Sequence, residues 1–296
     1  MNHSVINYND WTNNIDEWNQ LVTNATAECK FHNIETGSTN IAETENSYPT
    51  TTQILFELSI AHHMFSALRM DDLVWNHISI RKTKTTKDFY VTPFPIIFED
   101  ITPKELLNSS ISENDNDNTT GTIIHSAIYN ARPDVYAIVH LHSPAIMAIS
   151  CLKNGLDFLI QDSGAFYNQV AYHKWQGMSD DFAEQEILEE DFKNIKHHTL
   201  IMENHGACTV GKTIGEAWTR MYNLEKICKL QLEVMKATGG NRDLMIIPSN
   251  DILIHTAKQY DQFPNNCGVS EWPALVKWWS KRQLRHAPAP WNVSKL

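Results

Sequence analysis

Cysteine is scarce in this sequence and forms no metal-binding or disulfide pattern. The 296-residue chain has five cysteines, and no two of them are separated by two residues. An odd, scattered set argues against a disulfide framework or a cysteine-rich zinc module, and it favours a reducing compartment. Cys151 and Cys208 lie in apolar stretches without a histidine and an acid at readable spacing. We therefore interpret these two as buried, inert thiols rather than nucleophiles.

The chain also lacks an excess of basic residues, a long apolar run and an apolar N-terminus. Asp and Glu total 35 against 24 Lys and Arg, which gives a formal net charge of −11. This balance argues against nucleic acids and anionic membrane surfaces as partners. No apolar run approaches the roughly 20 residues that span a bilayer, and residues 1–18 contain no apolar signal core. We therefore expect a cytoplasmic protein.

What the chain does have is enough apolar sequence for a sizeable core, since hydrophobic residues make up 42% of it. Residues 1–50 are rich in Asn, Thr and Glu, and we predict a polar N-terminal extension there. Residues 51–245 are predicted to form the main domain. Residues 246–296 are expected to pack on the body or on a neighbouring subunit, because aromatic density at a terminus is typical of a contact. The tryptophans of this segment are Trp272, Trp278, Trp279 and Trp291.

Hydrophobic periodicity predicts both helices and strands in the main domain. Thr213 and Glu216 predict a capping box at the start of the last helix of this domain, and Gly239 predicts its end. Helices are predicted at 53–68, 123–131, 144–152, 182–195 and 213–238. Strands are predicted at 77–81, 88–92, 135–141, 158–160 and 170–172, and as a pair around a turn at 199–210.

Three histidines form the most informative pattern in the chain. His140 and His142 end an apolar run, and His205 lies in an Asn-His-Gly turn. Side chains alternate along a strand, so His140 and His142 point to the same face. Two imidazoles on one face, joined by a third from elsewhere, can hold a divalent metal ion with open positions for a substrate. We predict such a site, with Zn as the first choice and Fe or Mn as alternatives.

Several further motifs follow in order between about residues 55 and 240. They are Asn76–Arg81 (NHISIR), His125–Tyr129 (HSAIY), Ala131–Val135 (ARPDV), His140–His142, Val170–His173 and Asn204–Gly206. On these motifs the chain resembles the class II aldolase/adducin family, and its adducin-like branch most of all. The resemblance implies an α/β fold, namely a three-layer α/β/α sandwich with a central, mostly antiparallel sheet. It also implies a homotetramer with the active site near a subunit interface.

The resemblance places the metal on His140, His142 and His205. Adducin heads in the family are structural domains that have lost metal ligands, whereas this chain keeps all three histidines. A divalent ion chelated by substrate oxygens polarises a carbonyl and stabilises an enolate, which is the chemistry of a lyase. We therefore expect a metal-dependent lyase of the aldolase, decarboxylase or dehydratase type.

The acid–base group of such a lyase is less apparent. In the sugar-phosphate aldolases of the family, a glutamate lies nineteen residues before the first metal histidine. That position is Gly121 here, and glycine transfers no proton. Asp162 is the first substitute that we consider, and Tyr172 and His173 are further possible proton donors. Each has a structural alternative, as a solvated loop carboxylate or as a packed side chain.

The anion-binding turn of the family is altered as well. The family has a glycine before the strand, where small residues let backbone amides reach a phosphate. Here the turn contains Trp75 and no glycine. Ser79, Arg81, Thr119 and Thr120 could still bind a carboxylate, although Arg81 could equally serve a structural ion pair. We expect a small, non-phosphorylated substrate, with a carboxylate as the group that these residues would bind.

Two alternatives keep the same fold. A few relatives bind Fe(II) through three histidines and act as oxygenases, and three neutral ligands are compatible with that chemistry. The other alternative is a non-catalytic, adducin-like assembly module, which the glycine at position 121 favours and the intact histidines disfavour. The metal content of the protein separates these readings.

Overall fold

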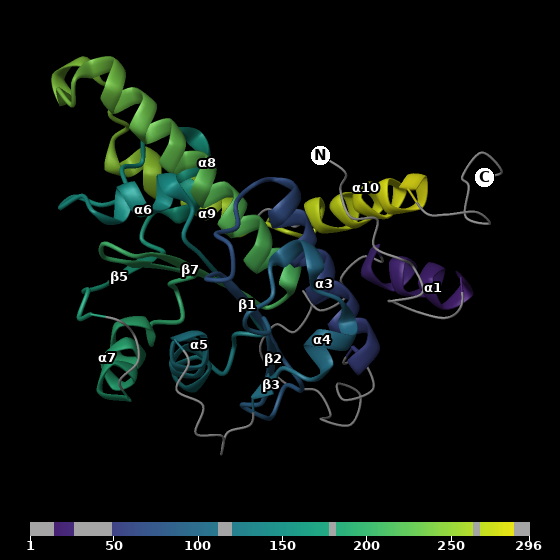
Figure 1. Cartoon of the computed structure of the whole chain (residues 1–296). Coiled ribbons are helices and arrows are strands. Elements are labelled where there is room, and N and C mark those ends of the chain that lie inside the picture. The colour runs from purple at the N-terminus through teal and green to yellow at the C-terminus, as the bar shows by residue number, and fades with distance from the viewer. Residues whose placement is uncertain (1–14, 27–48, 112–119, 178–181, 263–266, 287–296) are drawn as a thin grey trace.

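The computed structural model describes residues 15–26, 49–111, 120–177, 182–262 and 267–286. Within these residues, seven strands form one sheet in the order β3-β2-β1-β4-β7-β6-β5. Every neighbouring pair is antiparallel except β5 and β6, which are parallel. Helices cover both faces of the sheet (Figure 1). The expected three-layer α/β/α sandwich with a mostly antiparallel sheet is therefore confirmed.

The strands are short, and the helices between them vary in length. The strands are β1 His77–Arg81, β2 Phe89–Val91, β3 Ser110–Ile111, β4 Ala137–Leu141, β5 Val170–His173, β6 Thr199–Met202 and β7 Gly206–Gly211. The α-helices are α1 Ile15–Thr26, α3 Thr51–Ala67, α4 Pro103–Leu107, α5 Thr120–Ala131, α6 Pro144–Ser150, α7 Phe182–Phe192, α8 Ile214–Thr238, α9 Asn250–Gln262 and α10 Glu271–His286. The short 3-10 helices are η3 Phe98–Asp100, η4 Gln161–Phe166 and η5 Arg242–Leu244.

Two apolar cores lie on opposite faces of the sheet. Alternate residues of β4 divide between them, since Val139 and Leu141 join the core formed with α3, α6 and α8. Ile138 joins the core formed with α5 and α7. A strand sends successive side chains to opposite faces, so His140 faces the α5 layer. Both faces of this central strand are covered, and all five of its residues are buried.

Helix α3 is buried on nearly all sides, because twelve of its seventeen residues are buried. The Thr50 hydroxyl caps its N-terminus by accepting the N–H of Gln53. His62 and His63 lie inside this helix as packed residues. The Nδ1 of His62 is 2.7 Å from the carbonyl of Leu58, and the Nε2 of His63 is 2.8 Å from the carbonyl of Ile101. Burial lowers the pKa of His62 to about 3 and that of His63 to about 4, which keeps both rings neutral.

Helix α8 begins and ends where the sequence predicts. The Thr213 hydroxyl accepts the N–H of Glu216, as in a capping box. The Glu216 carboxylate, however, accepts the N–H of Lys212 rather than that of Thr213. At the other end, Gly239 adopts a left-handed φ of 60°, which closes the helix.

Two local predictions were wrong. Residues 158–160 form no strand, because Ser163 bonds to both the N–H and the carbonyl of Ile160 and starts the 3-10 helix η4 there. Such side-chain bonds compete with strand pairing. Cys151 is exposed at the end of α6 rather than buried, whereas Cys208 is fully buried as expected. Burial raises the pKa of the Cys208 thiol far above its usual range, so Cys208 is inert.

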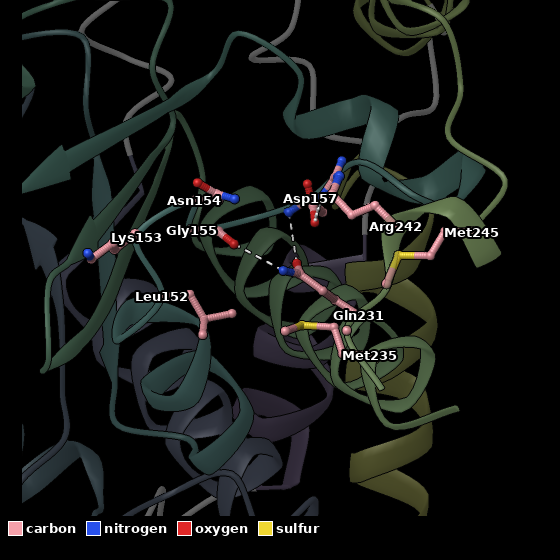
Figure 2. A pocket seen from close by; sticks show the side chains of 10 residues that line it. Leu152, Lys153, Asn154, Gly155, Asp157, Gln231, Met235, Arg242 and Met245 are labelled. Carbon is pink, nitrogen blue, oxygen red and sulfur yellow. Dashed lines mark hydrogen bonds and ion pairs between the residues drawn. The ribbon is translucent and has the colours of Figure 1, made fainter. Parts of the chain in front are cut away.

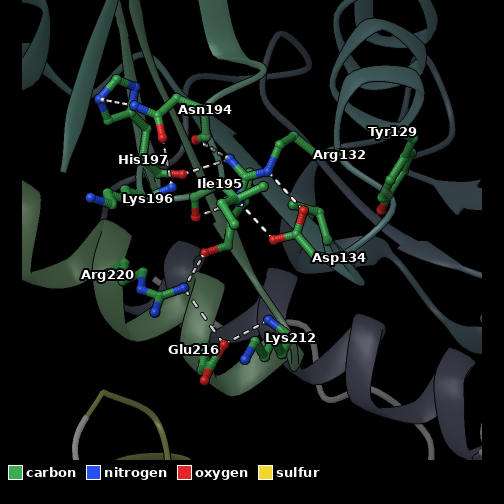
Figure 3. A network of polar contacts seen from close by, with 12 residues as sticks. Tyr129, Arg132, Asp134, Asn194, Ile195, Lys196, His197, Lys212, Glu216 and Arg220 are labelled. Carbon is green, nitrogen blue, oxygen red and sulfur yellow. Dashed lines mark hydrogen bonds and ion pairs between the residues drawn. The ribbon is translucent and has the colours of Figure 1, made fainter. Parts of the chain in front are cut away.

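Arg132 fastens the C-terminal end of α5 to the segment that precedes β6 (Figure 3). Its guanidinium pairs with both oxygens of Asp134 at 2.8 Å. The same group donates to the carbonyls of Asn194, Ile195 and His197. The side chain of Arg132 is only 3% exposed, so this network stabilises one edge of the fold rather than offering a charge to solvent.

The described parts of the two terminal segments contribute to the larger core. Leu21 and Ala25 of α1 are buried there, and so are Trp272 and Trp279 of α10. Helix α1 packs against α10 (Figure 1). The expected boundaries near residues 50 and 245 stay predictions. None of the helices in the described ranges is long and apolar enough to cross a membrane.

We expect the packing of α10 to carry a large part of the stability of the fold. Trp279 is 3% exposed and packs edge-on against Phe56, whereas the adjacent Trp278 is 40% exposed. Trp279→Ala should lower the free energy of unfolding by about 3–5 kcal/mol, and Trp278→Ala by about 1 kcal/mol or less. Denaturant unfolding followed by circular dichroism measures both. Equal effects of the two substitutions would contradict the packing described here.

Candidate metal centre

The three predicted histidines converge at one end of the central strand. The Nε2 of His142 lies 2.9 Å from the Nε2 of His140 and 2.9 Å from that of His205. His140 belongs to β4, His142 follows it directly, and His205 lies in the turn between β6 and β7. The ligand atoms of all three lie within 4.8 Å of one another. These are the groups that the sequence predicted as metal ligands.

The position of His205 in the Asn-His-Gly turn depends on a close approach of the backbone of Gly206 to that of Leu141. A Cβ on Gly206 would lie 2.6 Å from the carbonyl oxygen of Leu141. Only glycine therefore lets β7 begin so near the end of β4. Asn204 takes a positive φ of 56°, a conformation that asparagine adopts more readily than most residues. The turn thus aims His205 at the residue that follows Leu141.

Burial keeps the cluster neutral. Loss of hydration holds the pKa of His140 well below its ordinary value, and the neighbouring histidines lower it further. Burial, followed by repulsion from His142 and His173, lowers the pKa of His205 to about 4. Burial also lowers the pKa of His142, against an opposing effect of Asp72. Three neutral imidazoles have lone pairs to share, which is the state that a metal ligand requires.

The second ring nitrogen of two ligands has a partner behind it. The Nδ1 of His140 lies 3.3 Å from the sulfur of Cys208, and the Nδ1 of His142 lies 3.5 Å from the Asp72 carboxylate. Partners at Nδ1 fix the ring so that Nε2 faces the cluster. The donor set therefore fits a divalent ion of the zinc, iron or manganese type, held by His140, His142 and His205.

A second group of polar side chains lies directly behind the cluster, and of its members the sequence predicted a role only for Ser79, as a substrate-binding residue. The ring of His77 stacks on that of His140, with ring centroids 4.5 Å apart. The Nδ1 of His77 is 2.7 Å from the Nε2 of His125 on α5. Ser79 bonds in turn to the Nδ1 of His125 and to the hydroxyl of Tyr129. His77 and Ser79 alternate on β1, and His125 and Tyr129 lie four residues apart on α5, so spacing places each pair on one face of its element but does not join the two pairs.

Gly121 lies beside this second group. An added Cβ at Gly121 would lie 3.2 Å from the Cγ and Cδ2 atoms of His77, which is a tight contact. A side chain at position 121 and the ring of His77 therefore compete for the same space. A glycine at position 121 therefore fits the packing of His77 against α5.

Asp162 lies on η4 and has cationic and phenolic partners. Its carboxylate is 2.5 Å from the Nζ of Lys226 and accepts the hydroxyl of Tyr260 at 3.1 Å. The bond to Lys226 lowers the pKa of Asp162, which makes it a weaker base. A catalytic role for Asp162 stays a prediction, and the ion pair favours the structural alternative.

Tyr172 and His173 point to opposite faces of β5 and so do not act together on one face. The Tyr172 hydroxyl accepts the N–H of Leu156 and is partly exposed. His173 is buried between two carboxylates, with its Nδ1 2.8 Å from Asp191 and its Nε2 3.2 Å from Glu184. Both of its ring nitrogens are occupied, which leaves none for a substrate. Their catalytic roles stay predictions as well.

The predicted substrate-binding residues divide into two groups. Thr119 lies outside the described residues, and the side chain of Thr120 does too. Ser79 is fully buried and bonded to His125 and Tyr129. Arg81 is 4% exposed. Its guanidinium lies over the ring of Tyr129 and donates hydrogen bonds to four backbone carbonyls. The carbonyls are those of Thr86, Tyr129, Arg132 and Val135. The bonds to these carbonyls favour a structural role for Arg81.

A separate pocket of about 180 Å³ lies near the C-terminal end of α8 (Figure 2). Gln231 spans it, accepting the N–H of Asp157 and donating to the carbonyl of Gly155. Arg242 pairs with Asp157 at 2.6 Å. Arg242 and Asp157 neutralise each other, Lys153 adds a positive charge to the lining, and none of the three clustered histidines lines this pocket. We therefore assign it no part in the metal centre.

Fold and cluster together define a class of protein, namely α/β/α sandwiches that gather three imidazoles at the end of a central antiparallel strand. The family model described as "Class II Aldolase and Adducin N-terminal domain" matches residues 57–232. The chain belongs to the class II aldolase and adducin family.

Individual relatives agree with this assignment. Rat alpha-adducin is 31% identical over 199 residues, which are 64% of this chain and 27% of that protein. The chain therefore spans about a quarter of the length of that adducin. An aldolase II superfamily protein from Pseudomonas syringae has a TM-score of 0.71 at 27% identity, covering 81% of this chain and 97% of that one. An L-fuculose 1-phosphate aldolase from Glaciozyma antarctica has a TM-score of 0.64 at 26% identity, covering 84% and 96%.

Asp72 should tune the affinity of the cluster for metal. Its carboxylate is the group that orients His142, so Asp72→Asn should weaken Zn²⁺ binding by about tenfold, the lower end for such partners because Asp72 is half exposed. Asp71→Asn removes the same charge from the adjacent position and is the matched control. Equilibrium dialysis with Zn²⁺ measures both affinities, and a similar loss in the two variants would show a mere charge effect.

The buried histidines should make the metal-free protein sensitive to acid. Burial lowers the pKa of His62 and of His125 to about 3. The unfolded chain takes up these protons near pH 6.5 and the folded chain does not, so stability is full above pH 6.5 and falls as the pH drops towards 3. In that window, each of these two histidines should lower the free energy of unfolding by about 1 kcal/mol for each pH unit of acidification. Urea unfolding at pH 7 and pH 5 tests this, and equal stability at both would contradict it.

Proposed function

We propose that this protein is a metal-dependent lyase that acts on a small, non-phosphorylated substrate carrying a carboxylate. The observation that carries the proposal is the convergence of three neutral imidazole nitrogens on one point. The family supports it, since one of the similar structures is named as an L-fuculose 1-phosphate aldolase. The reaction would be of the aldolase, decarboxylase or dehydratase type.

His140, His142 and His205 would hold the ion, with Zn²⁺ as the first candidate and Fe²⁺ or Mn²⁺ next. Such an ion would supply a positive charge that polarises a substrate carbonyl and stabilises an enolate. The chain's own part is to orient these ligands. Asp72 and Cys208 hold two rings from behind, and Gly206 lets the third approach.

The surroundings of the cluster favour a substrate without phosphate. Arg81 is the basic residue of the first strand, and backbone carbonyls surround its guanidinium. Trp75, which is 55% exposed, stands in the turn before that strand. The charged group at the cluster is Asp72, which repels a dianion more strongly than a monoanion. A carboxylate that binds through the metal ion needs no separate cationic cradle.

The proposal also covers the binding partner, the cellular location and the oligomeric state. The formal charge of −11 favours a small molecule over nucleic acid or an anionic membrane surface. The four cysteines in the described ranges are free thiols, in keeping with a reducing, cytoplasmic location. We further propose a homo-oligomer, a tetramer by family resemblance.

Substitution of the histidines tests the metal site directly. His140→Ala, His142→Ala and His205→Ala should each lower Zn²⁺ affinity by at least about 100-fold, because each removes one of three ligands. His255→Ala is the control, since His255 is exposed on α9. Elemental analysis of the purified protein should find about one ion per chain in the parent and in the control.

Measurements of turnover and of metal binding distinguish the lyase from the oxygenase and from the adducin-like module. The zinc-loaded protein is incubated with a panel of small hydroxy- and oxo-acids, and cleavage is followed by proton NMR. Retention of turnover in all three histidine variants would end the lyase proposal. Oxygen uptake after anaerobic loading with Fe²⁺ would indicate an oxygenase instead. No stoichiometric ion, with no binding of added ions, would favour an adducin-like module, which the identity to alpha-adducin keeps as the second candidate.

A further inference from the structure

We propose that Glu225 is a positioning residue of the metal centre, which fixes the backbone of the ligand His142 through the hydroxyl of Ser143. The inference rests on the proposed function, because it assigns to Glu225 a role in holding a metal ligand. Glu225 belongs to α8, and neither Glu225 nor Ser143 is among the site residues that the sequence predicted. Its role is to act through the residue that follows His142, not to bind the ion or the substrate.

The backbone of each of the three ligands is held in a different way. His140 lies inside β4 and is paired with neighbouring strands on both sides. His205 lies in the turn between β6 and β7, where its N–H donates to the carbonyl of Met202 at 3.1 Å. His142 lies one residue beyond Leu141, which is the last paired residue of β4. The strand pairing ends before His142, so its position depends on helix α6, which follows it.

Helix α6 is attached at both ends to segments that carry ligands. Its N-cap residue, Ser143, directly follows His142. At the other end, the carbonyl of Ser150 accepts the N–H of Asn204 at 3.2 Å, and Asn204 directly precedes His205. The helix packs on α8 and on β7. A shift of α6 along α8 would therefore move His142 and His205 relative to each other.

A buried hydrogen bond fixes α6 against α8. The Ser143 hydroxyl donates to the Glu225 carboxylate, and the two residues are 2% and 4% exposed. The other carboxylate oxygen of Glu225 pairs with the Nζ of Lys229 at 2.9 Å. A hydrogen bond to an ionised acceptor is shorter and stronger than a neutral one. Apolar contacts are non-directional, whereas this bond defines one position of α6 on α8.

Stability alone would not favour these two residues. A serine at an N-cap ordinarily accepts an N–H of its own helix, but Ser143 makes no such bond, and its hydroxyl is turned to Glu225. A buried carboxylate loses hydration, and an apolar pair of similar volume often packs at least as well. A departure from the stabilising choice is typical of functional sites. It supports a role of this pair in positioning His142.

Metal binding by variants of the pair is the first test. Ser143→Ala and Glu225→Leu should each lower Zn²⁺ affinity by about tenfold, the lower end of the effect of residues that support a metal ligand from behind. Each should also shift the visible absorption bands of the cobalt(II)-loaded protein, which report the arrangement of the ligands. The double variant should lose no more affinity than either single variant, because both substitutions remove the same bond.

The double variant also distinguishes positioning from stability. It replaces the pair by apolar groups, so its free energy of unfolding should be at least that of Ser143→Ala. Its cobalt spectrum should nevertheless stay shifted. Conservative variants should act in the opposite way: Ser143→Thr keeps the hydroxyl and should give nearly the parent's spectrum. Glu225→Gln keeps an acceptor and should recover part of the affinity that is lost in Glu225→Leu.

Lys229→Ala is the matched control. It removes the other partner of the same carboxylate and leaves the bond to Ser143, and the side chain of Lys229 is 63% exposed. Its Zn²⁺ affinity and cobalt spectrum should equal those of the parent, because a surface ion pair of this kind holds little in place.

Hydrogen exchange of the metal-free protein gives a readout that needs no ion. A shift of α6 weakens the bond between the carbonyl of Ser150 and the N–H of Asn204. This amide should exchange about tenfold faster in Ser143→Ala than in the parent, whereas the amide of Val139 inside β4 should be unchanged. Mass spectrometry of the peptides that contain the two residues measures both rates.

The outcomes separate the inference from the proposed function. A parent protein that binds neither zinc nor cobalt would end the proposed metal centre, and the inference with it. A parent that binds cobalt, with the same affinity and spectrum in Ser143→Ala and Glu225→Leu, would overturn only the inference. An equal loss in Lys229→Ala would also overturn it, since it would indicate a general effect of charge on α8. If a single variant does not fold, the double variant, whose apolar pair needs no partner, gives the decision.

Discussion

The structure depends on one electrostatic constraint, namely that the Nε2 of His142 lies 2.9 Å from the Nε2 of both His140 and His205 without a charge among the three rings. Protonation of these rings would place cations at a distance where repulsion is strong. Burial removes this risk, because desolvation lowers the pKa of each ring. In this arrangement the nitrogen lone pairs of the neutral rings face one another and repel. A divalent cation at their centre would turn that repulsion into attraction, which is the physical support for proposing a metal site here.

The fold satisfies this constraint by unequal use of the two faces of β1 and β4. The face towards α3 and α8 is apolar, and Ile78, Ile80 and Val139 lie there. The face towards α5 holds polar side chains, including His77 and His140. Buried polar groups are tolerated only when they are bonded, and α5 supplies the partners through His125 and Tyr129. Helix α5 therefore supports the polar face next to His140, although none of the three clustered histidines belongs to it.

Local patterns in the sequence predicted what depends on local physics. Alternation along 135–141 placed His140 and His142 on one face, and the Thr213 cap and Gly239 bounded a long helix. The joining of His205 to that pair needed family resemblance, since the approach of Gly206 to the carbonyl of Leu141 is a contact between distant segments. The partners of Arg81 and the chain from His77 to Tyr129 also join residues some fifty positions apart. Spacing in the sequence carries no information on such contacts until the sheet register is known.

Gly121 and Arg81 are connected through the packing of β1 against α5. The absence of a side chain at position 121 leaves room for the ring of His77, which occupies the space beside it. The same strand carries Arg81, whose guanidinium is turned into backbone carbonyls, so the positive charge of the strand supports the fold. Helix α5 contacts both side chains, since the ring of His77 bonds to His125 and the guanidinium of Arg81 lies over the ring of Tyr129. The packing between this strand and this helix therefore decides both where the ring of His77 lies beside His140 and why the charge of Arg81 is turned away from it.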